Sequence, residues 1–342
     1  MNDELPTFTR AAVIGAGAWG TTLAWLLGGQ GRPVTLWARP QQAEAIARDR
    51  ENRLRLPGVK LPPTVQVCAD MAAAVTQADL IIVAVPSEHL RATVRGMGAW
   101  LRPEAVVMSA TKGLEVPTGK RMSEVLQEEL ALPPSRVVAL SGPNLSAEIV
   151  AGQPAVSAVA GYEETVVRRC QNFMATPLFR IYANCDILGV EICGALKNVL
   201  ALGAGISDGL GYGANARAAL VTRGLAEMGR IGTTLGAQRA TFWGVAGIGD
   251  VMATCNSHLS RNWQAGYRLA QGENLAEVTG QDGPVAEGVP TTAALQALVR
   301  KLGVPAPITG ALHEILFEGR APQDAVRELM TRPGRSEVES WH

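Results

Sequence analysis

One lysine stands alone in an apolar, helix-like stretch of the chain. Between Glu191 and Asp208 the only charged residue is Lys197. A charge taken out of water without a partner is unfavourable, and a buried lysine shifts its pKa readily. Lys197 must therefore reach water from a half-buried helix, meet a partner that is distant in the sequence, or transfer a proton to a substrate. None of its helical neighbours, three and four residues away, can pair with an ammonium group: Cys193, Gly194, Leu200 and Ala201.

A glycine-rich turn near the N-terminus is the second signal. The apolar run Ala11–Ile14 leads into Gly15-Ala16-Gly17-Ala18-Trp19-Gly20, and a helix-like stretch covers residues 21–28. In a dinucleotide-binding turn, the first glycine permits the tight bend, the second lets the backbone approach a pyrophosphate, and the third packs helix against strand. Because the chain has 37 glycines, the pattern alone is weak. Its position between strand and helix favours dinucleotide binding over a turn without a ligand.

Arg39 follows the next predicted strand, residues 33–38. A site that prefers NAD usually has Asp or Glu at this position, to hold the ribose 2′-hydroxyl. An arginine accommodates a 2′-phosphate, so Arg39 favours NADP over NAD. The alternative is a solvated surface arginine.

Composition excludes several classes of function. Lys plus Arg and Asp plus Glu both total 31 in 342 residues, so no basic excess attracts nucleic acid. No apolar run approaches the length of a membrane span, and residues 1–9 lack a signal-peptide core. The five cysteines are odd in number and form no C-x-x-C, which indicates reduced thiols in a cytoplasmic protein. The four histidines show no metal-ligand spacing, so we expect no metal.

The pattern of apolar runs predicts two domains. Short apolar strands alternate with helical stretches in the first half, which is typical of a doubly wound, mostly parallel, Rossmann-like sheet. After residue 186 helical patterns dominate. We predict an α/β dinucleotide-binding domain over residues 1–186 and an all-α substrate domain over 187–342. The predicted strands are 11–14, 33–38, 80–85, 105–109, 137–140, 155–159 and 178–182, and the predicted helices after the first are 41–50, 71–77, 89–101, 119–130, 145–150 and 163–174.

The second domain carries two further groups of polar residues. Asp250 lies among glycines and apolar residues, which suits a partner for the isolated lysine, a helix N-cap, or both. Ser260, Arg261 and Asn262 open a helix, where hydroxyl, guanidinium and backbone donors converge on an anion. Plain capping beside a surface arginine is the alternative.

Two loops of the first domain follow predicted strands at the edge where a ligand binds to such a sheet. Thr111-Lys112-Gly113 follows residues 105–109, and Ser141-Gly142-Pro143-Asn144 follows residues 137–140. Each could equally be an ordinary connection between strand and helix.

Taken together, these residues resemble the bacterial-type NAD(P)-dependent glycerol-3-phosphate dehydrogenase over nearly the whole chain. The glycine turn is widely shared, whereas the later blocks, in this order, are specific. The matching blocks are GAGAWGTTLA (15–24), AVPS (84–87), SATKGLE (109–115), LSGPN (140–144), GALKNVLALGAGISDGLGYG (194–213), LVTRGLAEM (220–228), GVAGIGDVMATC (244–255), SRN (260–262) and VAEGVPTT (285–292).

The resemblance implies reversible reduction of dihydroxyacetone phosphate to sn-glycerol 3-phosphate with NADP(H) or NAD(H), in a cytoplasmic homodimer that supplies phospholipid synthesis. By the same resemblance Lys197 is the general acid/base. The implied substrate contacts are Lys112, Gly142, Asn144, Lys197, Asp250, Ser260, Arg261 and Asn262. The implied cofactor contacts are Gly15, Gly17, Ala18, Trp19, Gly20, Arg39, Lys112, Ser146, Arg261, Val285 and Glu287.

Several positions depart from the family pattern. Ala147 replaces a frequent lysine, Ser146 a frequent alanine, Cys193 a glycine, and Ala214 a frequent aspartate. Arg55 stands where an aromatic residue often precedes Leu-Pro-Gly, which puts contacts at the edge of the cofactor in doubt.

The residues and the resemblance agree on one chemistry. As hydride reaches the ketone carbon, Lys197 supplies a proton to the oxygen, Asp250 holds the lysines, and Arg261 and Asn262 grip the phosphate. We expect this chemistry in a cleft between the two domains. The alternatives are a reductase of a ketopantoate-like or hydroxy-acid substrate, a redox sensor that binds NADP(H) without turnover, and a membrane-attached flavin enzyme that makes the same product. The Ser260–Asn262 anion site, the placed lysine, and the lack of a flavin feature argue against these three in turn.

Overall fold

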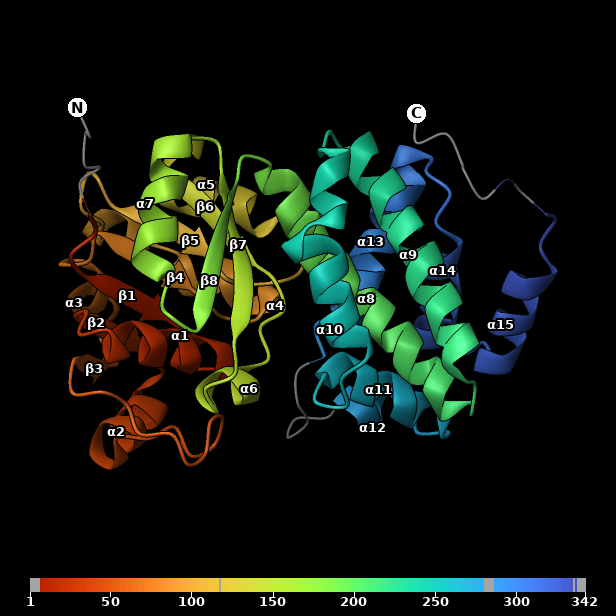
Figure 1. Cartoon of the computed structure of the whole chain (residues 1–342), viewed down its shortest axis with the longest axis horizontal. Coiled ribbons are helices and arrows are strands. Elements are labelled where there is room, and N and C mark those ends of the chain that lie inside the picture. Colours follow the sequence, from red (N-terminus) through yellow and green to blue (C-terminus); the bar gives the residue numbers. More distant parts are fainter. Residues whose placement is uncertain (1–6, 117, 280–285, 335, 337–342) are drawn as a thin grey trace. The chain divides into compact units, whose positions relative to one another are not determined.

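A computed structural model describes residues 7–116, 118–279, 286–334 and 336. By its internal contacts the chain forms two compact units. Unit 1 comprises residues 1–111 and 122–187, and unit 2 comprises residues 112–121 and 188–342. Figure 1 shows a sheet with helices in the first and a bundle of helices in the second.

An eight-stranded sheet forms the centre of unit 1, in the order β3-β2-β1-β4-β5-β6-β7-β8. All neighbours are parallel except β6 and β7, so the last two strands run against the rest. The order from β3 to β6 is that of a dinucleotide-binding sheet. The strands are β1 (Ala11–Ile14), β2 (Val34–Trp37), β3 (Val65–Cys68), β4 (Leu80–Val83), β5 (Val106–Ser109), β6 (Val137–Ser141), β7 (Ala155–Gly161) and β8 (Phe179–Asn184).

Helices cover both faces of this sheet, because its inner strands are apolar on both sides. Ala11 and Val13 of β1 pack in one core with α1, α2 and α7, while Ala12 and Ile14 pack in another with α3, α4 and α5. The helices are α1 (Ala18–Gly29), α2 (Pro40–Asp49), α3 (Met71–Val75), α4 (Ser87–Val94), η1 (Met97–Trp100), α5 (Met122–Leu130), η2 (Pro134–Arg136), α6 (Ser146–Val150) and α7 (Glu164–Met174).

The predicted fold class is confirmed, with differences in individual elements of unit 1. The sequence does not predict β3, a short strand that pairs only with β2 and includes the polar Gln66. The predicted helix over residues 89–101 is instead two helices, α4 and η1. Gly96 separates them with φ of +77°, a left-handed conformation that an α-helix cannot continue through.

Unit 2 consists of helices packed around α8, together with one hairpin. Its helices are α8 (Ile187–Gly209), α9 (Ala214–Thr234), η3 (Arg239–Trp243), η4 (Val245–Gly249), α10 (Asp250–Cys255), α11 (Arg261–Ala270), α12 (Leu275–Thr279), α13 (Gly288–Leu302), α14 (Pro307–Phe317) and α15 (Pro322–Thr331). Helices α8 and α11 cross in backbone contact. A Cβ added to Gly266 would lie 2.0 Å from the carbonyl oxygen of Leu202, so glycine is required there.

Helix α8 corrects one reading of the sequence. It is long and apolar enough to cross a membrane, although our sequence analysis predicts no apolar run of that length. In the structure 94% of its most apolar 18-residue stretch is buried inside the protein, as in the central helix of a helical domain. Its apolar surface is therefore covered by neighbouring helices.

The segment between β5 and α5 belongs to unit 2, although both flanking elements belong to unit 1. The sequence predicts a helix over residues 119–130, but α5 begins at Met122. Residues 112–121 form a hairpin instead, in which Leu114 and Arg121 are bridged in antiparallel fashion. The predicted first domain, residues 1–186, includes this hairpin, and the contacts of the structure assign it to the second unit.

Candidate active site

Unit 2 holds two lysines on a single buried aspartate. The Nζ of Lys197, on α8, donates to Oδ1 of Asp250 at 2.8 Å, and the Nζ of Lys112, on the hairpin, donates to Oδ2 at 2.7 Å. The exposed fractions of the side chains are 10% for Lys197, 15% for Lys112 and 1% for Asp250. Three predicted site residues that are far apart in the sequence therefore meet in one cluster.

The backbone before Asp250 explains how the carboxylate comes to face the lysines. The wide turn η4 leads directly into α10 and is kinked at Gly247, whose φ and ψ are −87° and −108°. A Cβ at Gly247 would lie 2.2 Å from the carbonyl oxygen of Phe242. Asp250 is the first residue of α10, not the residue before it, and both of its carboxylate oxygens accept from lysines. It therefore pairs with Lys197, as one of the two readings expected.

Thr254 completes the surroundings of Lys197, one helical turn after Asp250. Its hydroxyl accepts from the Nζ of Lys197 at 2.8 Å and donates to the backbone carbonyl of Asp250 at 2.7 Å. An ammonium group has three N–H donors. Two of them are engaged by Asp250 and Thr254, and the third has no partner among the described residues. One donor of Lys197 is thus left for a ligand oxygen.

The cluster carries two cations against one anion, and its pKa shifts reflect this arrangement. Burial lowers the pKa of Lys112 to about 8, with help from the charge of Lys197 and against the attraction of Asp250. Burial alone would raise the pKa of Asp250, but Lys112 and Lys197 outweigh it, and the pKa lies below its usual value. With both lysines charged the cluster has a surplus positive charge, which favours an anionic ligand.

The Ser260–Asn262 group opens α11 as the sequence predicts, and its three side chains differ in their surroundings. The Ser260 hydroxyl accepts from the backbone N–H of Trp263 at 3.3 Å, which is the plain capping role. Arg261 is exposed at the first position of the helix. Asn262 is buried. Its Nδ2 donates to Oδ1 of Asn198 at 3.0 Å, and its Oδ1 accepts from the N–H of Gly288 at 2.8 Å.

Asn262 connects this group to the cluster, because Asn198 directly follows Lys197 on α8. It also reaches the start of α13, where Glu287 directly precedes the helix. Val285, predicted to contact the cofactor, lies outside the described residues.

The glycine turn of unit 1 fits the backbone of a dinucleotide. Gly15 has φ of +109°, and a Cβ there would lie 2.7 Å from the carbonyl oxygen of Ala84. A Cβ at Gly20 would lie 2.0 Å from the carbonyl oxygen of Gly15, so strand and helix touch there. A Cβ at Gly17 would meet nothing within 4 Å, and no side chain caps α1 at this point. Open space therefore lies beside the residue that directly precedes this 12-residue helix, where a dinucleotide phosphate usually binds.

The remaining predicted cofactor residues of unit 1 follow β1, β2 and β6. Ala18 and Trp19 begin α1, with Trp19 packed edge-on against Phe179. Arg39 is exposed at the start of α2, and Ser146 begins α6. Gly142, a predicted substrate contact, follows β6 with φ of +154°, and a Cβ there would lie 2.8 Å from the Cα of Ser157.

Within the described part of the chain, several buried polar atoms of unit 1 have no hydrogen-bond partner. They are Nε1 of Trp19, Nδ2 of Asn144, and the hydroxyls of Ser109 and Ser141, which lie in the last positions of β5 and β6. Buried polar groups are normally hydrogen-bonded, so a ligand or water completes them. This is a second observation that fits a polar ligand at this edge of the sheet.

Sequence reasoning missed four polar residues that support these sites. Thr254 contacts Lys197 and could have been found by its spacing of one helical turn from Asp250. Asn198 contacts the Asn262 side chain, and only its position next to Lys197 indicates it. Gln42 and Asn52 donate to the carbonyl of Ala16 in the glycine turn, at 2.7 and 2.9 Å. Nothing in the sequence indicates these last two contacts, because they connect the turn to α2 and the loop after it.

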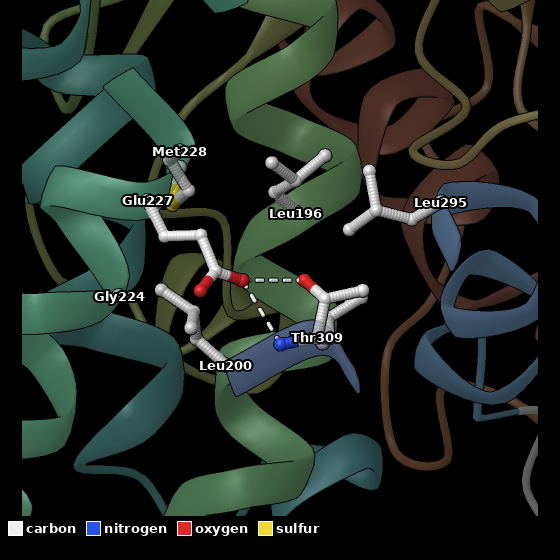
Figure 2. A pocket seen from close by; sticks show the side chains of 8 residues that line it. Leu196, Leu200, Gly224, Glu227, Met228, Leu295 and Thr309 are labelled. Atoms are coloured by element: carbon white, nitrogen blue, oxygen red, sulfur yellow. Dashed lines mark hydrogen bonds between the residues drawn. The ribbon is translucent and has the colours of Figure 1, made fainter. Parts of the chain in front are cut away.

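A small cavity lies elsewhere in unit 2, around the buried Glu227 of α9. It offers about 10 Å³ for the centre of a water-sized sphere, which is room for about one water molecule. Figure 2 shows Glu227 pointing to Thr309, whose N–H and hydroxyl both donate to its Oε1, at 2.9 and 2.6 Å. Its other oxygen accepts from the N–H of Ile308 at 2.9 Å, so Glu227 caps α14. Burial raises the pKa of this carboxyl.

A dinucleotide-type turn on a Rossmann-like sheet, together with a buried lysine–aspartate cluster on a helical unit, defines a nicotinamide-dependent oxidoreductase. Comparisons with known proteins agree. Models of the NAD-dependent glycerol-3-phosphate dehydrogenase N-terminus and C-terminus match residues 10–167 and 186–327.

Relatives match over nearly the full length. The glycerol-3-phosphate dehydrogenase [NAD(P)+] of Nitratidesulfovibrio vulgaris is 45% identical, over 96% of this chain and all of the relative. That of Geobacillus kaustophilus is 46% identical, over 96% of both chains. The crystal structure of glycerol-3-phosphate dehydrogenase from Coxiella burnetii is 35% identical with a TM-score of 0.91, covering 96% of this chain and all of that one. The chain belongs to the family of NAD-dependent glycerol-3-phosphate dehydrogenases.

Proposed function

We propose that this chain reduces dihydroxyacetone phosphate reversibly to sn-glycerol 3-phosphate with NADPH or NADH. The observation that carries the proposal is the Lys197 ammonium group, which is buried, held by Asp250 and Thr254, and has one donor to offer. The family to which the chain belongs supports the same reaction. The product is the usual backbone precursor of glycerophospholipids.

Lys197 acts as the general acid in the direction of reduction. Its Nζ gives a proton to the carbonyl oxygen of the substrate as that oxygen gains negative charge, and the resulting neutral amine takes up a proton again from solvent. Hydrogen bonds to Asp250 and Thr254 hold the amine in place. The Thr254 hydroxyl donates to the backbone carbonyl of Asp250, so its oxygen is oriented to accept from Lys197. In the reverse direction the neutral amine accepts the proton from the hydroxyl.

Lys112 and Asp250 set the charge around the reacting oxygen. Asp250 balances one of the two lysines, and the remaining positive charge stabilises the developing oxyanion in a place shielded from water. We assign the phosphate to the start of α11, where Arg261 is exposed and Asn262 keeps one amide N–H beyond its bond to Asn198. Ser260, Gly142 and Asn144 are further proposed substrate contacts.

The cofactor is proposed to lie along the glycine turn. When bound, the nicotinamide supplies or accepts the hydride. Gly15, Gly17 and Gly20 shape the turn, space is open beside Gly17, and Ala18 and Trp19 begin the helix whose first N–H groups would bind the pyrophosphate. The other proposed contacts are Arg39, Lys112, Ser146, Arg261 and Glu287, and Val285 outside the described residues.

The direct test follows nicotinamide oxidation by the purified chain with dihydroxyacetone phosphate. We expect turnover with this substrate and little with non-phosphorylated dihydroxyacetone, because that compound has no phosphate for the anion site. We also expect little turnover with a ketopantoate-like acid, because we assign the cluster to a ketone that carries a phosphate. Turnover of the acid instead would favour the other reductase. No nicotinamide oxidation with any ketone would favour a sensor.

Replacing Lys197 by alanine should lower kcat by about 10²–10⁴-fold, the usual contribution of a positioned general acid. Asp250 keeps Lys112 as a partner, so the fold should tolerate the change. NADPH affinity, measured by fluorescence titration, should stay near that of the parent. Lys301→Ala, an exposed lysine on α13, is the matched control and should retain full turnover. Near-normal turnover of Lys197→Ala would exclude Lys197 as the acid.

Arg39 favours NADP, because an exposed guanidinium after β2 suits a 2′-phosphate. We expect kcat/KM to be higher with NADPH than with NADH, and Arg39→Asp to lower the value for NADPH. The two values are measured side by side on parent and variant. A parent that prefers NADH would contradict this assignment.

We further propose a cytoplasmic homodimer with no membrane-inserted segment. All five cysteines are free thiols, which suits a reducing compartment, and α8 is covered by its neighbours. Light scattering checks the oligomeric state, and a mass near 36.0 kDa at working concentration would contradict the dimer.

A further inference from the structure

The hairpin that carries Lys112 is tightly constrained within itself. The N–H of Glu115 donates to the carbonyl of Lys120 at 2.9 Å, and the N–H of Gly119 donates back to the carbonyl of Glu115 at 2.7 Å. Leu114 is bridged to Arg121, and the Thr118 hydroxyl donates to Oε2 of Glu115 at 2.5 Å. Arg121 is therefore fixed across the hairpin from Leu114, two residues after Lys112.

Each end of the hairpin makes a buried ion pair with the rest of unit 2. Lys112 pairs with Asp250, as described above. At the other end, Nη1 of Arg121 donates to Oε2 of Glu191 at 2.7 Å, with 11% and 6% of the two side chains exposed. Glu191 lies on α8, six residues before Lys197, which is about 9 Å along the helix axis. The second ion pair thus ties the hairpin to the helix that carries Lys197.

We propose that Glu191 is a positioning residue for the reaction, holding Arg121 so that the hairpin presents Lys112 to Asp250 beside Lys197. The inference rests on the proposed function, since it assigns Glu191 to the reductase chemistry of the cluster. Without Glu191, Arg121 is a buried cation that has lost a counter-charge, and such a group draws toward water. Because Arg121 is bridged to Leu114, a displacement of Arg121 also displaces Leu114 and, two residues before it, Lys112.

The kinetic test is Glu191→Gln, which keeps the shape of the side chain and removes its charge. We expect kcat/KM for dihydroxyacetone phosphate to fall about 10–100-fold, the loss that a displacement of about 1 Å produces at a reacting centre. The KM for NADPH should change less than kcat/KM for dihydroxyacetone phosphate, because Lys112 is only one of the proposed cofactor contacts and the glycine turn lies in unit 1. Glu314→Gln is the matched control. It removes the charge of another glutamate of unit 2 that is paired with an arginine, Arg320, and it should leave both constants unchanged.

A shorter carboxylate separates positioning from a general effect on folding. Glu191→Asp keeps the negative charge and should recover most of the activity lost in Glu191→Gln. Melting curves of all variants are recorded, and kinetics are measured well below the lowest midpoint. Equal kcat/KM in the parent and in Glu191→Gln overturns the proposal. An equal loss in both Glu191 variants, with no recovery by aspartate, also overturns it.

A second readout does not depend on turnover. The reactivity of the Lys112 amine toward an acylating reagent is measured against pH by peptide mass spectrometry, in the parent and in Glu191→Gln. Burial is the main cause that lowers the pKa of Lys112, and the charged groups that act on it are Asp250 and Lys197. If Lys112 leaves the cluster, its reactivity curve should move to higher pH.

An unchanged curve overturns the positioning role, whatever the activity. If the parent chain fails to turn over dihydroxyacetone phosphate, the proposed function fails by itself. The Lys112 curve still decides whether Glu191 holds the hairpin.

Discussion

At the scale of single residues, the cluster contains one carboxylate for two lysines. Two lysines share Asp250, one on each oxygen, and Thr254 takes a third hydrogen bond from the pair. Removing the shared carboxylate would leave two buried cations together, which is far less favourable than removing either lysine. Asp250 is therefore the residue of this site on which both the fold and the chemistry depend.

The pH dependence of the reaction should report Lys112. Its pKa is lowered to about 8, so Lys112 is charged below that pH and loses its charge as the pH rises through it. The surplus positive charge of the cluster then disappears, and kcat/KM for the anionic substrate should fall above pH 8. Lys112→Arg keeps a cation over the whole accessible range, so its profile should lack this fall even where its activity is lower. An identical alkaline fall in Lys112→Arg would assign the titration to another group.

At the scale of elements, the turn between β1 and α1 uses its glycines for different purposes. Gly20 lets the helix touch the strand, whereas Gly17 leaves space in front of the helix. The carbonyl of Ala16 between them is held by the amides of Gln42 and Asn52, so the turn is fixed from outside as well. This separation of roles gives two alanine variants with opposite expected behaviour.

Gly17→Ala should fold normally, because its backbone angles suit any residue and the new methyl meets no protein atom within 4 Å. It should weaken NADPH binding by about 10–100-fold, since overpacking typically costs about 1–3 kcal/mol. Gly20→Ala places a methyl 2.0 Å from a backbone oxygen, so it should lower the melting temperature despite the better helix propensity of alanine. Calorimetric titration and thermal melts measure the two effects. A loss of binding without a loss of stability in Gly20→Ala would reverse the assignment.

At the scale of the whole molecule, each unit depends on contacts between distant parts of the chain. Unit 2 is held by the close crossing of α8 and α11, and by Asn262 of α11, which bonds to residues of α8 and α13. Glu227 of α9 caps α14, and Figure 2 shows its side chain beside Thr309. Glu227 lies 82 residues from Thr309 in the sequence. None of these contacts touches the lysine cluster directly, but those of α11 and Asn262 fix α8, the helix that carries Lys197.

Glu227→Gln should lower the melting temperature of the protein by about 3–8 °C. The amide replaces one carboxylate oxygen with a donor that faces the N–H of Ile308, and a buried group left unsatisfied typically costs about 1–3 kcal/mol. Glu328→Gln, an exposed glutamate of α15 paired with Arg320, is the control and should shift the midpoint by no more than about 1–2 °C. Equal melts for the two variants would show that the cap contributes little.

The sequence by itself determined the class of fold, the glycine turn, and the candidates Lys197, Asp250 and Asn262. Each of these follows from local information: the apolar period of strands and helices, the spacing of glycines, and an isolated charge in apolar surroundings. The missed strand β3 and the divided helix at Gly96 are short-range features too weak or too ambiguous for such patterns.

Only the tertiary structure decided that Lys112 and Lys197 share Asp250, that Arg121 pairs with Glu191, and that the hairpin belongs to unit 2. These contacts join residues between 53 and 138 positions apart. A hydrogen bond depends on where the folded backbone places two groups, and local pattern in a sequence carries no information about that distance. The same reason makes α8 resemble a membrane span by composition while its neighbours bury it.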